Sequence, residues 1–350
     1  MAPHTWRIGL IGFGNVGQGF VRILARKGDE LRRRYNFDFK VVGIADPVKG
    51  SVFDPEGLDV KKLIELIDKY GHIKDYPKGR KDIDSLFLCR SDAIDIIVEV
   101  TPTNVKTGEP GLTHIREALK HGKHVVTSNK GPIALAYPEL KRLAEENGVF
   151  LRFEGVVLSG TPAINLALEA LAGVDIKRVQ GIVNGTTNFI LTKMEEGMTY
   201  EEALKEAQRL GYAEADPTAD VEGWDAAVKA VIIANVIMGG SITINDVERE
   251  GITKITLEDV RKAKEEGCRI KLIAEVVREG GTIRASVKPR KVPLTHPLAN
   301  VMGAINALTF ETDHLGPVTI VGPGAGRVET GQAILTDVLA IHRYTHGGKI

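Results

Sequence analysis

Short apolar runs alternate with segments of helical periodicity along the first half of the chain. Apolar runs predict strands over residues 7–11, 39–45, 93–100, 124–127 and 149–153. Hydrophobic residues recur every three or four positions between these runs, which predicts helices over 60–70, 111–120 and 132–147 and an earlier one that continues through Arg34. An alternation of strands and helices is typical of a doubly wound parallel sheet, so we expect an α/β domain here.

The pattern changes after residue 153. Strands are predicted over 176–183, 269–277, 282–287 and 304–311, and helices over 200–210, 225–238 and 330–341. These strands do not alternate regularly with helices, which indicates an α+β domain around a largely antiparallel sheet. We therefore predict three parts, with boundaries at 1–153, 154–321 and 322–350.

The first predicted strand leads directly into Gly12-Phe-Gly14-Asn-Val-Gly17, which a helix follows. Glycines at this spacing permit a tight turn, close approach of the backbone to a pyrophosphate, and close packing of helix on strand. The N–H groups at the start of the helix then face the phosphates. This context predicts a dinucleotide-binding domain of the Rossmann type.

Asp46 ends the second predicted strand, where a carboxylate usually accepts hydrogen bonds from the adenosine ribose. A carboxylate at that position favours NAD, because it repels the 2′-phosphate of NADP. Lys49 lies just beyond and can pair with such a phosphate, so the preference between NAD and NADP stays open. A polar insertion follows at residues 50–81, and its sequence indicates no function.

The segment from Gly211 to Lys229 brings several acidic residues and one lysine to the start of an apolar helix. Asp225 and Lys229 are four residues apart and therefore share one helix face. A lysine among Ala, Val and Ile side chains is poorly solvated, which suits it to proton transfer. An active site and an ordinary ion pair at the edge of a core both explain this pattern.

Composition excludes several classes of protein. The chain has 350 residues with 46 basic and 46 acidic side chains, so no global field attracts nucleic acid or an anionic membrane. Its start lacks the apolar run of a signal peptide, and its only cysteines, Cys89 and Cys268, form neither a disulfide framework nor a metal-ligand pattern. We expect a globular protein of the cytoplasm.

Taken together, the motifs resemble homoserine dehydrogenase over nearly the whole chain. The family signature is matched by Ala207, Gly211, Asp216-Pro217, Asp220, Gly223, Asp225 and Lys229. Further motifs occur in family order: Gly12–Gly17, Thr127-Ser-Asn-Lys-Gly131, Glu154 with Ser159-Gly-Thr-Pro162, Asn184-Gly-Thr-Thr187 and Gly322-Pro-Gly-Ala-Gly-Arg327. The resemblance implies a Rossmann-type domain, an α+β catalytic and dimerisation domain, and a final helix that returns to the dinucleotide-binding domain.

What the resemblance implies is NAD- or NADP-dependent interconversion of L-homoserine and L-aspartate 4-semialdehyde, a step toward threonine, methionine and isoleucine. Lys229 then resembles the family's proton donor, Lys130 a second cation near the reacting oxygen, and Asp220 a group that orients one of these lysines. An ammonium at this place stabilises charge on oxygen and then supplies the proton.

Further site residues follow from the same resemblance. The substrate is expected to contact Glu214 and Asp225 through its α-ammonium, and also Gly211 and Thr186. The cofactor is expected to contact Gly12, Phe13, Gly14, Asn15, Val16, Gly17, Asp46, Thr101, Lys130 and Gly326. A monovalent cation such as sodium is expected at Glu154 and the carbonyl groups of Val157, Ser159 and Thr161.

The resemblance also bears on assembly and regulation. Family members are typically homodimers through the second domain, and the apolar stretch 270–287 suits a sheet continued across a two-fold axis, although internal strands explain it equally well. Residues 345–350 are all that follows the last predicted helix, so we expect a monofunctional enzyme without a regulatory or aspartate kinase domain, and no threonine feedback through one.

Two other functions compete with this one. An aspartate-semialdehyde dehydrogenase requires a nucleophilic cysteine, and neither Cys89 nor Cys268 has an evident histidine partner. A catalytically silent NAD(P)-binding sensor would keep the glycine turn without any need for Asp225 and Lys229 in an apolar helix. Turnover measured beside cofactor binding separates the sensor from the enzyme.

Overall fold

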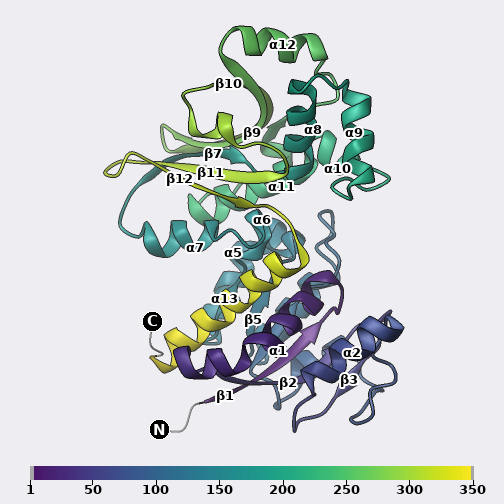
Figure 1. Ribbon diagram of the computed structural model, residues 1–350. Coiled ribbons are helices and arrows are strands. Elements are labelled where there is room, and N and C mark those ends of the chain that lie inside the picture. Colours follow the sequence, from purple (N-terminus) through teal and green to yellow (C-terminus); the bar gives the residue numbers. More distant parts are fainter. Residues whose placement is uncertain (1–3, 348–350) are drawn as a thin grey trace. The chain divides into compact units, whose positions relative to one another are not determined.

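A computed structural model describes residues 4–347 of the chain (Figure 1). Within this range the chain divides into two compact units. Unit 1 contains the residues up to Gly160 and those from Gly326 onward, and unit 2 is Thr161–Ala325. The first unit is thus built from both ends of the chain.

Unit 1 holds a sheet with the strand order β3-β2-β1-β4-β5-β6. Its strands are β1 (Thr5–Ile11), β2 (Asp38–Ala45), β3 (Val52–Phe53), β4 (Ile96–Glu99), β5 (His124–Thr127) and β6 (Leu151–Arg152). The pairings described in it are parallel except that of β2 with β3. The chain leaves β1 for β2 on one side and later returns to β4 on the other, which creates the switch point where such sheets bind ligands.

Helices accompany this sheet as the periodicity predicts. They are α1 (Asn15–Tyr35), α2 (Val60–Tyr70), α3 (Ser85–Arg90), α4 (Gly111–Lys120), α5 (Lys130–Glu146), α6 (Gly155–Leu158) and α13 (Arg327–His346). The prediction of a doubly wound α/β domain is confirmed. β3 lies in the polar insertion and α3 follows it, and the sequence did not indicate them because elements of two and six residues are too short to show a period.

The last helix, α13, packs along α1 within unit 1 (Figure 1). Two glycines permit this contact: a Cβ on Gly19 would lie 2.0 Å from the carbonyl oxygen of Arg327, and one on Gly331 would lie 2.6 Å from the amide nitrogen of Phe20. The expected return of the final helix to the dinucleotide-binding domain is therefore confirmed.

Unit 2 holds a second sheet, with the order β12-β11-β7-β9-β10-β8. The strands are β7 (Ile176–Ile182), β8 (Val247–Arg249), β9 (Cys268–Glu279), β10 (Thr282–Pro293), β11 (Ile305–Thr312) and β12 (Pro317–Pro323). Its described pairings are antiparallel except that of β8 with β10. The predicted α+β domain is confirmed, and the apolar stretch Ile270–Val287 forms strands inside the sheet.

Helices and short helical turns connect the strands of the second sheet. They are α7 (Ala163–Asn165), α8 (Gly185–Glu195), α9 (Tyr200–Arg209), α10 (Thr218–Val221), α11 (Trp224–Ile232) and α12 (Leu257–Glu265), with π-helical turns η1 (Leu166–Ala170) and η2 (Ile233–Ile237) and 3₁₀ turns η3 (Ile244–Asp246) and η4 (Pro297–Asn300). Of these, α8, α11 and α12 pack against the sheet. The single helix predicted over 225–238 ends at Ile232 and continues as a π-helical turn.

Several elements of unit 2, among them α8, α12 and β12, were missed by the sequence prediction. Nearly every side chain of α8 is buried, so no polar face marks its helical period. Strand β12 was not predicted, although its Val-Thr-Ile-Val run consists of residues that favour strands. Within the described residues, no helix is long and apolar enough to cross a membrane.

Candidate active site

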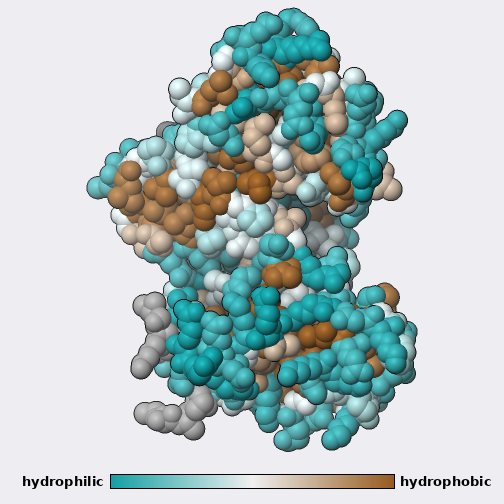
Figure 2. Space-filling model, in the orientation of Figure 1, coloured by the Kyte–Doolittle hydropathy of each residue, from teal (hydrophilic) through white to brown (hydrophobic). Residues whose placement is uncertain are grey.

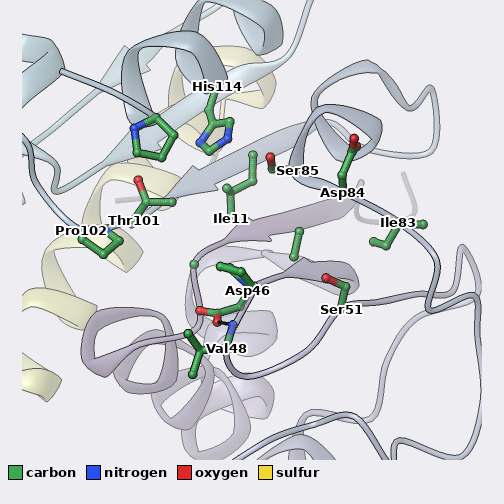
Figure 3. A pocket seen from close by; sticks show the side chains of 14 residues that line it. Ile11, Asp46, Val48, Ser51, Ile83, Asp84, Ser85, Thr101, Pro102 and His114 are labelled. Atoms are coloured by element: carbon green, nitrogen blue, oxygen red, sulfur yellow. Dashed lines mark hydrogen bonds between the residues drawn. The ribbon is translucent and has the colours of Figure 1, made fainter. Parts of the chain in front are cut away.

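A cavity of about 460 Å³ opens in unit 1 at the switch point of the parallel sheet (Figure 3). Its lining combines the ends of β1 and β2, the segment after β4, the start of α4, and part of the insertion. The lining residues are Ile11, Gly12, Ala45, Asp46, Pro47, Val48, Ser51, Ile83, Asp84, Ser85, Thr101, Pro102, Pro110 and His114. Three predicted cofactor residues, Gly12, Asp46 and Thr101, are therefore brought together around one cavity.

The glycine turn beside this cavity has the geometry that a dinucleotide requires. Gly12 has φ of 95°, and a Cβ on it would lie 2.6 Å from the carbonyl oxygen of Val100. A Cβ on Gly17 would lie 2.7 Å from the carbonyl oxygen of Gly12. A Cβ on Gly14, in contrast, would have no neighbouring atom within 4 Å. The turn is thus tightly packed on its inner side and accessible at Gly14, where the backbone can approach a pyrophosphate.

The remaining residues of the turn serve the fold and the start of α1. Phe13 is almost completely buried, and Asn15 begins α1, with Val16 partly buried against the core of the unit. Asn15 accepts a hydrogen bond through Oδ1 from the guanidinium of Arg327, 3.0 Å away, at the first residue of α13. Gly326 lies at the N-terminal boundary of that helix with φ of 138°.

Asp46 lies where the sequence predicted it, at the end of β2. Its Oδ2 accepts the N–H of Phe13 at 2.6 Å, and its Oδ1 accepts the N–H groups of Val48 and Lys49 at 2.9 and 2.7 Å. Three backbone donors therefore fix the carboxylate between the glycine turn and the loop after β2. Lys49 is not among the residues that line the cavity.

A buried carboxylate behind the cavity was missed by the sequence reasoning. Glu99, at the end of β4, is fully buried and accepts hydrogen bonds from both the amide and the hydroxyl of Thr101. Its Oε2 accepts the hydroxyl of Thr127 at 3.1 Å, and the amide of Asn129 reaches the carbonyl of Thr101 at 3.4 Å. The visible signal is an acidic residue within an otherwise apolar strand, and its effect is to join the loops that follow β4 and β5.

Lys130 is the first residue of α5, two residues earlier than the predicted start of that helix. Asn129 caps the helix by accepting the N–H of Gly131 at 3.3 Å. The lysine is half-buried at a helix start rather than placed in a surface turn. The cap of Asn129 and the carboxylate of Glu99 together fix the backbone that carries it.

Lys229 forms the centre of the candidate catalytic group in unit 2. The residue is 7% exposed, and its ammonium donates to the carbonyl of Val183 at 2.6 Å and to Oδ2 of Asp225 at 2.7 Å. The predicted pairing of the two residues on α11 is confirmed. The carbonyl of Val183 at the end of β7 could not be foreseen, because a backbone acceptor leaves no trace in the sequence.

Asn184 joins the acidic residues around this lysine. Its side-chain amide donates to Oδ1 of Asp220 at 2.6 Å and to Oδ2 of Asp225 at 3.0 Å, while its oxygen accepts the N–H of Thr187 and so caps α8. Burial is the largest influence on Asp220 and raises the pKa of its carboxyl, with the nearby charge of Asp225 acting in the same direction. The sequence placed Asn184 in a family motif but did not indicate this bridging position.

The other predicted substrate residues lie on neighbouring loops of unit 2. The hydroxyl of Thr186, on α8, donates to the carbonyl of Tyr212 at 2.6 Å, next to Gly211. Glu214 is exposed, and its backbone carbonyl accepts a hydrogen bond from Gln208 at 3.1 Å. Thr186 and Gly211 are therefore close in space, and Glu214 follows in the same short loop.

The predicted cation ligands form one tight segment. Glu154 and Val157 are almost fully buried, and Ser159, just after α6, has φ of 55°, which turns the backbone sharply. The amide of Glu154 donates to Asp337 of α13 at 2.7 Å. Thr161 begins unit 2 and is buried.

The cysteines do not support a thioester mechanism. Cys89 is completely buried, and burial raises the pKa of its thiol to about 12. Cys268 lies in β9 with its thiol near the carbonyl of Glu266, 3.7 Å away. A thiol must ionise to act as a nucleophile, so Cys89 is unsuited to the chemistry of an aspartate-semialdehyde dehydrogenase.

Comparisons with known proteins match both parts of the chain. A family model described as homoserine dehydrogenase matches residues 162–339, and one described as homoserine dehydrogenase, NAD binding domain, matches residues 12–154. The NAD(+)-dependent homoserine dehydrogenase of Pseudomonas canavaninivorans is 45% identical, covering 97% of this chain and 96% of that protein. The homoserine dehydrogenase of Methanocaldococcus jannaschii is 48% identical, covering 96% and 98%.

Solved structures agree with these relatives. A putative homoserine dehydrogenase from Archaeoglobus fulgidus matches with a TM-score of 0.87 and 44% identity, covering 96% of this chain and 99% of that one. A mutant hyperthermophilic archaeal homoserine dehydrogenase in complex with NADPH matches with a TM-score of 0.83 and 34% identity, covering 97% and 98%.

Proposed function

Since the chain belongs to the homoserine dehydrogenase family, we propose that Lys229 exchanges the proton in that family's reaction, the NAD- or NADP-dependent interconversion of L-homoserine and L-aspartate 4-semialdehyde. The protein is an oxidoreductase that acts on a CH–OH group, in the biosynthesis of threonine, methionine and isoleucine. The observation that carries the role of Lys229 is its ammonium, buried and held by Asp225 and the carbonyl of Val183.

In this reaction Lys229 donates a proton in one direction and accepts it in the other. The nicotinamide, when bound, supplies or accepts the hydride at C4 of the substrate. In the reductive direction the electrons of the aldehyde C=O bond move to oxygen, and the Lys229 ammonium stabilises that charge and transfers its proton. In the oxidative direction the neutral amine of Lys229 takes the hydroxyl proton as hydride leaves C4. Asp225 and the Val183 carbonyl hold the nitrogen in one position during both transfers.

The neighbouring residues complete the site that we propose. Lys130 supplies a second cation to the reacting oxygen, and Asp220 orients Lys229 through the amide of Asn184, which also reaches Asp225. The carboxylates of Glu214 and Asp225 take the substrate α-ammonium, with Thr186 and Gly211 as further substrate contacts. The opposite charges of substrate and carboxylate support this part of the proposal.

The cofactor fits the residues of unit 1. The open backbone at Gly14 and the start of α1 suit the pyrophosphate, and the cavity beside Asp46 suits the adenosine. His114 lines the same cavity, and its Nδ1 lies 3.7 Å from Oε1 of the buried Glu99, so the carboxylate that anchors Thr101 also neighbours this wall of the cavity. The proposed contacts are Gly12, Phe13, Gly14, Asn15, Val16, Gly17, Asp46, Thr101, Lys130 and Gly326.

A monovalent cation such as sodium is proposed at Glu154 with the carbonyl groups of Val157, Ser159 and Thr161. A buried carboxylate next to a sharply turned backbone is the kind of hard oxygen donor set that such an ion prefers. The test compares the melting temperature of wild type and Glu154→Gln in sodium chloride and in tetramethylammonium chloride at equal ionic strength. Sodium should stabilise the wild type alone.

We also propose a homodimer formed through unit 2. Strand β12 is at an edge of its sheet, and Ile305, Leu315 and Val321 on and beside the β11–β12 hairpin are 37%, 59% and 53% exposed. Figure 2 shows an apolar surface over this hairpin. An exposed apolar edge favours association with a second strand. Sedimentation of wild type and Val321→Lys tests the proposal, because a lysine at the edge should weaken the dimer.

The protein is proposed to act in the cytoplasm. Both cysteines are free in the described structure, and Cys89 is completely buried. Unpaired cysteines are usual in a reducing compartment. Fractionation of cells from the source that express a tagged chain would test this assignment.

The activity test follows the absorbance of reduced nicotinamide with L-homoserine and each cofactor in turn. Wild type should give homoserine-dependent reduction, whereas Lys229→Ala should lose about 10²-fold or more in kcat with cofactor binding nearly intact. Lys205→Ala, an exposed lysine on α9, is the matched control and should keep full turnover. Cofactor binding without turnover in the wild type would favour a catalytically silent sensor, and wild-type turnover of Lys229→Ala would remove Lys229 from the reaction.

A further inference from the structure

The cofactor cavity has an unequal distribution of charge. Among the described residues that line it are two carboxylates, Asp46 and Asp84, and no lysine or arginine. Asp46 belongs to the loop after β2, whereas Asp84 lies just beyond the polar insertion at residues 50–81, at the start of α3. Residues 50–85, which join the two, are called the insertion from this point on. The insertion also supplies Ser51, Ile83 and Ser85 to the lining. It therefore forms a wall of the cavity rather than a separate surface loop.

We propose that the insertion completes the adenosine pocket and makes the enzyme select NAD over NADP, with Asp84 as a second specificity residue beside Asp46. NADP differs from NAD by a 2′-phosphate on the adenosine ribose, a group that carries up to two negative charges. The end of β2 is where doubly wound sheets bind this ribose. A phosphate placed there meets two carboxylates and lacks the arginine or lysine that usually neutralises it.

The first carboxylate cannot move away from the phosphate. Asp46 accepts three backbone N–H groups, from Phe13, Val48 and Lys49, at 2.6, 2.9 and 2.7 Å. A different orientation would break all three of these hydrogen bonds, two of which are partly shielded from solvent. The residue is consequently a fixed negative charge, and Figure 3 shows it with Val48 and Ser51 on one side of the cavity.

The second carboxylate is held by a different element. Asp84 caps α3, and its Oδ1 accepts the N–H of Phe87 at 2.7 Å. This bond places the side chain at the cavity wall and uses only one of its oxygens for the cap. Ser51 and Ser85, from the same insertion, offer hydroxyl groups that can hydrogen-bond a free ribose hydroxyl. The wall thus favours an uncharged 2′ position.

Lys49, the residue that would favour NADP, does not oppose these charges. It is absent from the described lining of the cavity, and its amide N–H is directed to Asp46. Its neighbour Val48 does line the cavity and is 70% exposed. A cation introduced at Val48 would therefore reach the cavity that Lys49 leaves uncovered.

Calorimetric titration of NAD and NADP, with no substrate present, tests the proposal independently of turnover. Wild type should bind NAD at least about tenfold more tightly than NADP, and the ratio should decrease at high salt because screening weakens the repulsion. Asp84→Asn keeps a good helix cap and should strengthen NADP binding several-fold with NAD binding unchanged. Val48→Arg should also strengthen NADP binding, by supplying a partner for the phosphate.

Asp75→Asn is the matched control, because Asp75 is exposed in the same insertion but does not line the cavity. It should leave both affinities unchanged. Asp46→Ala is unsuitable as a test variant, since it would leave three backbone donors without their acceptor and weaken the binding of both cofactors. Tighter binding of NADP than NAD by the wild type, or an equal change of both affinities in Asp84→Asn, would overturn the proposal. Neither result would affect the assignment of the homoserine reaction.

Discussion

Lys229 and Asp225 form an ion pair of 2.7 Å across one turn of α11, and both side chains are largely withdrawn from solvent. Asp225 also accepts the amide of Asn184 at 3.0 Å. The carboxylate therefore fixes the position of the ammonium while its own position is fixed by a second helix.

Replacing Asp225 by Asn should lower kcat for homoserine oxidation by about 10–100-fold, because the lysine loses its charged partner. KM for homoserine should rise as well if the carboxylate contacts the substrate α-ammonium. Steady-state kinetics at saturating cofactor would measure both constants. Glu201→Gln, an exposed change on α9, provides the control. Unchanged kcat in Asp225→Asn would show that the ion pair only stabilises the helix.

Asn184→Ala should reduce both stability and activity, because one side chain caps α8 and bridges Asp220 to Asp225. Loss of the cap alone costs about 1 kcal/mol of unfolding free energy. Asn184→Ser retains a capping oxygen but cannot donate to both carboxylates. We expect the serine variant to recover most of the stability, measured by urea unfolding, without recovering kcat. Full recovery of both properties would refute the bridging role.

Lys271 should make the stability of the protein depend on alkaline pH. It is almost fully buried on β9, where it donates to Asn188 and to the carbonyl of Val301 at 3.0 and 2.6 Å, and burial lowers its pKa from 10.5 to about 8. Between these two pH values the unfolded chain binds more protons than the folded one at this site, so the contribution of Lys271 to stability rises with pH.

The comparison uses Lys271→Met, which removes the titrating group. The melting temperature of wild type relative to this variant should increase as pH rises from about 8 to 10.5 and should be constant below that window. Lys177→Met, an exposed change on β7, is the control for general effects of alkaline pH. A constant difference across the whole range would mean that Lys271 titrates alike in both states.

Glu99→Gln should weaken cofactor binding about tenfold with a smaller effect on kcat. The carboxylate accepts from the amide of Thr101 and from the hydroxyl of Thr127, and a glutamine amide cannot replace all of its acceptor positions. The loops after β4 and β5 would then lose their common anchor. Calorimetric titration of NAD gives the affinity, and Asp92→Asn, at a fully exposed site nearby, gives the control. If Glu99→Gln bound NAD as tightly as the wild type does, the role of Glu99 would be limited to folding.

Sequence patterns predicted the parallel sheet, the glycine turn and the Asp225–Lys229 pair because each rests on local spacing. Contacts between distant segments carry no such signal. The fixation of Asp46 by Phe13 and the bridge from Asn184 to Asp220 both depend on how separate loops meet, so they became visible only in three dimensions. Helix α8 escaped prediction for a different reason, since burial on every side removes the polar face by which a helix is recognised.

Because α13 packs on α1, unit 1 can complete its fold only late in translation. A ribosome releases β1 and α1 before the strands and helices of unit 2, but it releases the helix that covers them, with Gly331 against Phe20, only after that unit. Thr161–Ala325 must therefore emerge before the first unit can close. A chain that stops short of Arg327 exposes the apolar side of α1 to water, and such exposure favours aggregation.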